Sequence, residues 1–503
     1  MKKWLKGALL LLVVVSFVLI SCEGNSNSGV SSDKATNTTA EQVSSEPASS
    51  TKSASDKIKI TVVGDGGNNQ VAWLWNQQEM EDEFGCEIEI VSVPFENLYT
   101  KLKTEFVGNT GAYDIIVYFP KFMGDFVENG YIIPIDDYIA KDDPNLADIV
   151  PAFQELYGKW GGKTYNLPYD GDVLALFYRN DIFTDPIEKQ NFKAKYGYEL
   201  HTPKTWDEYM DIAEFFTRKK GDTLMGKVLT EDFYGTATYG QQDFQYCWYM
   251  CIAGSMGADY FDEDMNPTIN SPEAVKALEL FKEQFKYCPP ECTNFGFDEL
   301  QAIFLEGNCA MEIQWTDPGR VGQNPEISNI SGKIGTALVP GTKQADGTIK
   351  NTATLAAGRV MAISSTCKNP DIAYQIIRYM SQEASLAYVS SPQSGQDPFR
   401  FSHYENTGAF EMFERQSDAV DYLNGIKENL EHGYPELMIP GAQQYLDQLA
   451  VNINDYISSN TMTAQKALDN TAKQWNDITN TYGKDNMKTA YKNMLVQVRS
   501  VGL

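Results

Sequence analysis

The sequence predicts an α/β fold made of two lobes. Two observations lead to this prediction. The chain has 503 residues, which exceeds the size at which a single core keeps growing, so two lobes or domains are expected. The part that follows the N-terminal region alternates strand and helix patterns, and this alternation gives a parallel sheet with crossover helices.

The N-terminal region has its own composition. Residues 1–21 combine three lysines with an apolar run over residues 8–20, which is typical of a secretory signal peptide and too short to span a membrane. The run ends in Leu-Ile-Ser-Cys, which resembles a bacterial lipobox with Cys22 as the lipidated residue. Residues 22–57 are rich in Ser, Thr, Asn and Ala, so we expect a lipidated N-terminus followed by a disordered tether.

Charge and cysteine usage limit the possible partners. The formal net charge of −27 repels phosphate backbones, so nucleic-acid binding is not expected. Lipidation of Cys22 leaves seven of the eight cysteines, and an odd number leaves at least one free thiol. Cys288 and Cys292 are candidates for a local disulfide, whereas Cys247 and Cys251 have the spacing of buried thiols on one helix face. The three histidines are scattered and none is next to a cysteine pair, so a zinc site is not expected. We expect no other metal and no cofactor.

The first lobe begins directly after the tether. Apolar patterns predict strands over 58–63, 87–93 and 114–119, and helices over 70–84 and from 95 onward. Ligands of such sheets collect at the carboxyl ends of the strands. Those ends are occupied here by residues 64–69, residues 94–97, and Tyr118, Phe119 and Lys121.

The segment 161–183 has the character of a ligand cleft. Tyr169, Asp170 and Asp172 precede an apolar strand predicted over 173–178. Residues two apart on a strand point to the same side, so both aspartates could line one pocket. Two alternatives remain open at this point, since the pair could serve as acid and base of a glycosidase, or could be solvated turn residues beside Gly171.

The second lobe begins after this segment. Thr205 and Glu208 form a capping box that starts a helix, and Ser271 with Pro272 starts another. A short strand is predicted over 310–315, and further helices from 369 onward and over 464–479.

Several known motifs are approached but incomplete. The glycines after the first strand lack the last position of a dinucleotide loop, and the run before Thr164 lacks the first glycine of a phosphate loop. Asp262 to Glu273 follows the EF-hand spacing, but Pro267 occupies the position that requires glycine. No nucleophile elbow is present in the sequence.

Aromatic residues are frequent near the predicted ends of elements, among them Tyr118, Trp248 and Trp315. Sugar rings stack on such side chains, while sugar hydroxyls need fixed polar partners. Tyr169 next to Asp170, and Trp315 close to Asp317, are therefore the strongest candidates for a sugar site.

Seven segments together carry a family resemblance. Their order along the chain is as follows: GYIIPIDDYI (Gly130–Ile139), GKTYNLPYDGDVLALFYRNDIF (Gly162–Phe183), PKTWDEYMDIAEFF (Pro203–Phe216), FLEGNCAMEIQW (Phe304–Trp315), IGTALVPG (Ile334–Gly341), NPDIAYQIIRYM (Asn369–Met380) and PELMIPGAQQYLDQL (Pro435–Leu449). In this order the chain resembles the bacterial extracellular solute-binding proteins of sugar ABC importers, the family of maltose-binding protein.

The resemblance implies a two-lobed periplasmic-binding-protein fold, type II-like, with two parallel or mixed sheets flanked by helices and hinge strands between the lobes. Lobe 1 would comprise 57–169 plus 341–390, and lobe 2 would comprise 170–340 plus 396–503 with the C-terminal helices. The hinge crossings would fall near 170–174, 339–341 and 391–395. The ligand-binding residues carried over by position are Tyr169, Asp170, Asp172, Trp315, Asp317, Gly358, Arg359 and Arg400, with Trp248 and Tyr118 nearby.

The function that the resemblance implies is non-enzymatic. A mono- or oligosaccharide would bind between the lobes, which close by hinge motion, and the loaded form would deliver it to a membrane permease and its ATPase. The protein would be an exported monomer, anchored to a bacterial membrane through lipid on Cys22. The open alternatives are a secreted carbohydrate-active enzyme that uses Asp170 and Asp172, and a binder of a non-sugar solute such as a peptide or polyamine.

Overall fold

The computed structural model describes residues 57–459 and 461–503. The predicted signal peptide, the predicted lipidation site Cys22 and the predicted tether up to residue 56 lie outside the described residues. Within the described part of the chain, no helix has the length and apolar composition needed to cross a bilayer.

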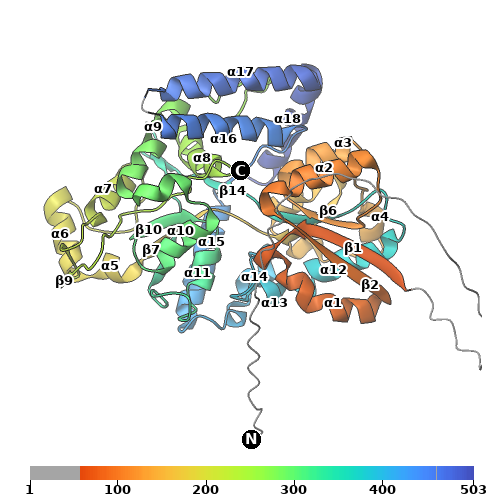
Figure 1. The fold of residues 1–503 in the computed structure, drawn as a ribbon, viewed down its shortest axis with the longest axis horizontal. Coiled ribbons are helices and arrows are strands. Elements are labelled where there is room, and N and C mark those ends of the chain that lie inside the picture. The colour runs from red at the N-terminus through yellow and green to blue at the C-terminus, as the bar shows by residue number, and fades with distance from the viewer. Residues whose placement is uncertain (1–56, 460) are drawn as a thin grey trace, which may run out of the picture. The chain divides into compact units, whose positions relative to one another are not determined.

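A five-stranded mixed sheet contains the first three strands of the chain and one strand from its C-terminal half (Figure 1). Its strands in spatial order are β2 (Cys86–Val93), β1 (Ile58–Asp65), β3 (Ile115–Tyr118), β15 (Arg359–Ile363) and β6 (Asn166–Asp170). The pairs of β1 with β2 and β3 are parallel, and β15 runs antiparallel to both β3 and β6. The start of β15 therefore lies at the same edge of the sheet as the ends of β1, β3 and β6.

Helices cover both faces of this sheet (Figure 1). They are α1 (Val71–Phe84) and α12 (Pro370–Ser381), which pack together on one face, and α2 (Leu98–Gly108) and α3 (Met123–Glu128) on the other. The parallel pairing follows from the crossover helices α1 and α2, since a chain that returns through a helix re-enters the sheet in the same direction.

A three-stranded antiparallel sheet forms a second centre, in the order β10, β7, β11. The strands are β10 (Met311–Gln314), β7 (Ala175–Arg179) and β11 (Ile334–Ala337). The helices around it are α5 (Asn180–Thr184), α6 (Pro186–Tyr196), α7 (Trp206–Phe216), α10 (Phe297–Leu305), α11 (Asp317–Val321) and α15 (Gln416–Leu430). The predicted capping box of Thr205 and Glu208 is confirmed at the start of α7.

Five further helices pack against one another in a separate group (Figure 1). They are α8 (Gln245–Met256), α9 (Pro272–Gln284), α16 (Ala442–Ser458), α17 (Ala464–Tyr482) and α18 (Lys484–Ser500). Helix α8 is buried on nearly all sides, which is why its sequence is apolar all round. Ser271 caps α9 as predicted, with its hydroxyl accepting the N–H of Ala274.

Short elements complete the fold. They are the helices α4 (Asp136–Ile139), α13 (Ser385–Val389) and α14 (Phe401–Glu405), the hairpins β4–β5 (Lys159–Trp160, Lys163–Thr164), β8–β9 (Thr223–Leu224, Lys227–Val228) and β12–β13 (Thr342–Lys343, Ile349–Lys350), and the parallel pair β14 (Ala353–Leu355) with β16 (Gly433–Pro435).

The chain crosses between the five-stranded and the three-stranded sheet, and the sequence predicts these crossings only in part. Residues 171–174 connect β6 of one sheet to β7 of the other, close to the expected crossing at 170–174. The expected crossing at 339–341 differs, because Gly341 bridges to Thr205 and the chain re-enters the five-stranded sheet only at Arg359, after β14. The exact lobe boundaries remain a prediction.

The cysteines of the described residues are all free, which corrects the candidate disulfide between Cys288 and Cys292. Each of these two thiols instead donates to a backbone carbonyl, that of Gln284 at 3.3 Å and that of Thr238 at 3.0 Å. Cys247 and Cys251 are buried thiols, as their spacing predicted.

Candidate functional site

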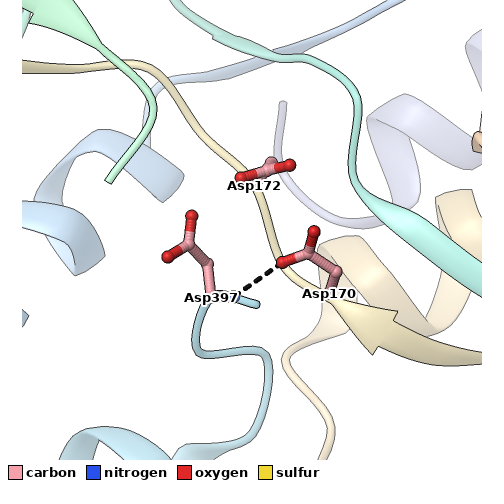
Figure 2. A group of neighbouring side chains, drawn as sticks. All are labelled: Asp170, Asp172 and Asp397. Atoms are coloured by element: carbon pink, nitrogen blue, oxygen red, sulfur yellow. Dashed lines mark hydrogen bonds between the residues drawn. The ribbon is translucent and has the colours of Figure 1, made fainter. Parts of the chain in front are cut away.

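Three buried carboxylates meet where the chain leaves the five-stranded sheet. Asp170 ends β6, Asp172 follows in the crossing, and Asp397 comes from a separate segment between α13 and α14 (Figure 2). One oxygen of each lies within 4.8 Å of the others, and an oxygen of Asp170 accepts the Asp397 backbone N–H at 2.6 Å. We call Asp170, Asp172 and Asp397 the acidic cluster.

Glycine at position 171 permits this arrangement. A Cβ at Gly171 would lie 2.4 Å from the Pro398 carbonyl oxygen and 2.8 Å from Cβ of Phe399. Any side chain there would push the 397–399 segment away and separate Asp397 from Asp170.

Arg359 connects the acidic cluster to the sheet. Its Nε and Nη2 donate to Asp65 at 3.0 and 2.9 Å, its Nη1 donates to Asp170 at 2.5 Å, and Nη1 lies 3.5 Å from Asp172. Asp65 ends β1, Arg359 begins β15 and Asp170 ends β6, so the strand directions bring all three to one edge. Charge-assisted contacts of this kind fix side-chain positions firmly.

A second arginine holds Asp397's segment. Arg320 of α11 is fully buried, and its Nη1 donates to the carbonyls of Val389 at 2.9 Å, Ser391 at 2.9 Å and Gln396 at 3.0 Å. Its Nη2 lies 3.5 Å from Asp397 and 3.4 Å from Asp317. Arg320 therefore ties the 389–397 segment to the second sheet's helix.

Several polar atoms in this region have no hydrogen-bond partner among the described residues. They are both carboxylate oxygens of Asp397, Nε of Arg320 and Oγ1 of Thr316. All three side chains are fully buried. A buried polar group without a partner costs free energy on the order of 1–3 kcal/mol, and more for a charged group, so native proteins keep few of them without a functional reason.

The electrostatics of the site disfavour additional negative charge. Burial raises the pKa of Asp170, against the opposing effect of Arg359, and burial also raises the pKa of Asp317. Burial raises the pKa of Asp172 well above its usual range, with a further contribution from the nearby Asp170 and Asp397 carboxyls. The arrangement suits a ligand that brings hydrogen-bond donors.

An aromatic cluster lies around Trp315, at the end of β10. Its members are Tyr239, Phe244, Trp248, Phe297 and Trp315. The Trp315 ring stands edge-on to Trp248 at 5.1 Å, and Trp248 stacks on Tyr239 at 4.5 Å. The indole N–H of Trp315 donates to the Ala356 carbonyl at 2.8 Å, which attaches this cluster to the segment leading into Arg359.

Contacts also join the first sheet's edge to the second half of the chain. Phe95 packs on Phe244 at 5.0 Å between ring centroids. Lys121 Nζ lies 2.9 Å from Tyr246 Oη and 3.1 Å from Glu436 Oε1, and is buried. The structure thus has the strand ends of the first sheet in contact with α8 and the residues after β16.

Two of the expected site residues have packing roles in the structure. Gly358 allows close approach of Tyr157, since a Cβ there would lie 2.4 Å from the Tyr157 ring. Tyr169 is buried, and its hydroxyl donates to the Asn69 carbonyl at 2.8 Å.

Three more expected site residues also have protein partners. Tyr118 donates to Asn166 at 2.8 Å, Trp248 donates to the Ile313 carbonyl at 2.6 Å, and Arg400 donates to the carbonyls of Ser381, Asn145 and Pro144 at 2.6–3.1 Å. Of the other expected residues, Asp170 and Asp172 contact Arg359, Asp317 contacts Arg320, and Trp315 bonds to the segment that leads into Arg359.

Three residues of this site were missed by sequence reasoning: Asp65, Arg320 and Asp397. Asp65 lies in the strand end 64–69, which was expected to face a ligand. Arg320 and Asp397 lie in or next to segments already singled out, but only the fold brings them together, because 77 positions separate them.

The chain belongs to the family of bacterial extracellular solute-binding proteins, whose sequence pattern matches residues 75–386. A putative binding protein of Brucella abortus is 26% identical over 303 residues, which is 59% of this chain and 65% of that protein. The chain thus spans less than two thirds of the length of this curated relative. The arabinooligosaccharide-binding protein of Halalkalibacterium halodurans is 22% identical over 409 residues, 78% of this chain and 82% of that protein.

Solved structures agree on the architecture. The chain is similar to a solute-binding protein of Agrobacterium radiobacter in complex with ribitol, with a TM-score of 0.70, 23% identity and coverage of 84% of this chain and 99% of the other. A maltose-bound protein of T. maritima gives a TM-score of 0.67 at 20% identity, with coverage of 84% and 100%. The fold is the two-lobed periplasmic-binding-protein fold, as the sequence predicted.

Proposed function

We propose that this protein is the solute-binding component of an ABC-type importer and that it binds a carbohydrate or polyol between its lobes. The observation that carries the proposal is the buried Asp397 carboxylate, which has no hydrogen-bond partner in the described residues and faces Asp170 and Asp172. Sugar and polyol hydroxyls are donors that would satisfy it.

The relatives support the chemical class. Two of the relatives are a mannitol-binding protein of Pseudomonas aeruginosa and the arabinooligosaccharide-binding protein of Halalkalibacterium halodurans. The aromatic cluster would offer ring faces for the C–H surfaces of the ligand, with Trp315 as the central ring.

Binding would work by hinge closure. Only contacts that both lobes make at once can favour the closed state. Asp170 and Arg359 stand at the edge of one sheet, and Trp315 follows a strand of the other, so a solute that touches all three would hold the lobes together. The loaded form would then pass its solute to a membrane permease and its ATPase, with the monomeric protein anchored through lipid on Cys22.

A titration test decides between carbohydrate and other solutes. Calorimetry with ribitol, mannitol, maltose and arabino-oligosaccharides, beside amino acids and polyamines, is expected to give saturable binding only for a polyol or sugar. Release of reducing ends from an oligosaccharide would instead favour an enzyme that uses Asp170 and Asp172.

A pair of tryptophan variants tests the position of the site. Trp315→Ala should weaken binding of the best ligand about tenfold or more, because it removes a large stacking surface, while the exposed Trp75 of α1 serves as a matched control with Trp75→Ala. Circular dichroism checks that both variants remain folded. Unchanged affinity in folded Trp315→Ala would remove this residue from the site.

A further inference from the structure

The charge balance around the acidic cluster is uneven. Five buried carboxyl groups make their salt bridges, among the described residues, with only two guanidiniums: Asp65, Asp170 and Asp172 with Arg359, and Asp317 and Asp397 with Arg320. A buried carboxylate without a compensating cation is unfavourable, and such a group tends to take up a proton instead. The raised pKa values of Asp170, Asp172 and Asp317 reflect burial and the same shortage of positive charge, because these carboxyls retain their protons more readily when no further cation is nearby.

The deficit is concentrated at Asp172 and Asp397. Asp65 and Asp170 make close bonds to Arg359, at 2.5–3.0 Å. The contacts of Asp172 with Arg359 and of Asp397 with Arg320 are both 3.5 Å, and neither Asp397 oxygen accepts a hydrogen bond from the described residues. Asp172 and Asp397 therefore lie side by side, and among the described residues no guanidinium nitrogen is closer than 3.5 Å to either carboxyl.

We propose that the solute bound here carries a protonated amine, which Asp172 and Asp397 hold between their carboxylates. This inference rests on the proposed function and narrows its ligand to an amino sugar or amino polyol. An ammonium group has up to three N–H donors and one positive charge. It therefore supplies hydrogen-bond donors to the Asp397 oxygens and a positive charge to the cluster. A hydroxyl supplies one donor and no charge.

A divalent metal ion fits the same carboxylates less well. Both oxygens of Asp170 already accept hydrogen bonds, from Arg359 and from the Asp397 backbone. Calcium requires six to eight oxygen ligands at about 2.3–2.6 Å. A doubly charged ion at that distance would also face the guanidiniums of Arg359 and Arg320, each 3.5 Å from one of its ligands.

Matched ligand pairs test the inference on the whole mature protein. Each pair differs only by an amine in place of a hydroxyl: glucosamine and glucose, galactosamine and galactose, glucamine and sorbitol. Calorimetry at pH 7 is expected to show tighter binding of an amine member, on the order of tenfold or more, because hydrogen bonds to charged groups are stronger than neutral ones.

A variant then assigns the preference to the cluster. In Asp397→Asn the ratio of affinities between amine and hydroxyl members should fall to about one. Asp346→Asn is the matched control, since Asp346 is exposed and bonds only within its own turn, to Thr348; it should keep the wild-type ratio.

The outcomes separate this inference from the proposed function. The amine proposal would be wrong if the neutral members bind equally or more tightly, or if Asp397→Asn keeps the preference for the amine. Either result would leave the proposed carbohydrate site in place. Calcium binding that Asp397→Asn abolishes, without an amine preference, would assign the cluster to a metal and overturn the inference. If no member of any pair binds, and ribitol, mannitol and maltose also fail, the proposed function falls together with it.

Discussion

Two regions of the site contain buried carboxylates, and these carboxylates differ in how many close bonds they make to an arginine. At the edge of the five-stranded sheet, Asp65 and Asp170 are bonded to Arg359 at 2.5–3.0 Å. In the 389–400 segment, Asp397 has only a 3.5 Å contact with Arg320 and no hydrogen bond to its side chain from the described residues. Burial is the same in both regions, since these side chains are nearly or fully inaccessible.

This difference indicates which carboxylates stabilise the fold and which remain able to bind a ligand. A carboxylate whose hydrogen bonds are complete stabilises the fold and has little capacity left for a ligand. A carboxylate that is held in place by its backbone but lacks side-chain partners keeps that capacity. On this reasoning the carboxylates at the sheet edge belong to the scaffold, and Asp397 is the carboxylate that we propose binds the solute.

Loss of Arg359 should give the largest effect. Arg359→Ala leaves Asp65 and Asp170 buried without their cation, so the free energy of unfolding should fall by about 3–5 kcal/mol. Urea denaturation followed by circular dichroism measures it. Arg415→Ala is the control, because the Arg415 side chain is exposed in its pair with Asp418 and pairs of this kind contribute little to stability. Equal effects in the two variants would contradict the scaffold role of Arg359.

Acid should weaken the segment that contains Asp397. His403 is buried, its Nδ1 accepts the Phe399 N–H at 3.2 Å, and its Nε2 lies 2.9 Å from Ser385 Oγ. Burial, with Arg400 nearby, lowers the pKa of His403 from 6.5 to about 3. The neutral ring therefore contributes stability that is complete above pH 6.5 and is lost as the pH falls toward 3, at up to about 1.4 kcal/mol per pH unit.

The variant His403→Gln isolates this effect. The raised pKa values of the buried aspartates act in the opposite direction, since their contribution is complete below their ordinary pKa and is lost as the pH rises. That contribution is common to both proteins and cancels in their difference. The stability advantage of wild type over His403→Gln should shrink by about 2 kcal/mol between pH 7 and pH 5; a constant difference would mean that His403 does not titrate in this range.

Asp397→Asn should have the smallest effect on stability. It removes a buried charge that has little compensation, so the free energy of unfolding should stay within about 1 kcal/mol of wild type or rise. Asp65→Asn is the matched comparison, because the same change there breaks close bonds to Arg359 and should cost about 3 kcal/mol or more. Equal losses in the two variants, measured by urea denaturation, would erase the distinction between scaffold and binding carboxylates.

Much of the architecture follows from local patterns. The first strands and helices and the caps at Thr205 and Ser271 depend on residues close in sequence, so periodicity and capping chemistry predict them. The family resemblance supplied the two-lobed fold and pointed to Asp170, Arg359 and Trp315.

The pairing of charges could not be predicted in this way. Asp170 was expected in the site, but its bond to Arg359 joins residues 189 positions apart. Arg400 was also a candidate for the site, yet it donates to the backbone carbonyls of Ser381, Asn145 and Pro144. Which arginine meets which acid depends on strand order and on loop paths, and neither is encoded in local spacing.

The Arg359 contacts have a consequence for how the protein acquires its binding property. They join residues up to 294 positions apart, and Asp397 reaches them only after most of the chain has been made. Contacts of such long sequence separation form late and slowly during folding. A nascent chain that ends before residue 397 would therefore lack a complete site, and recovery of solute binding during refolding should follow, not precede, assembly of the five-stranded sheet.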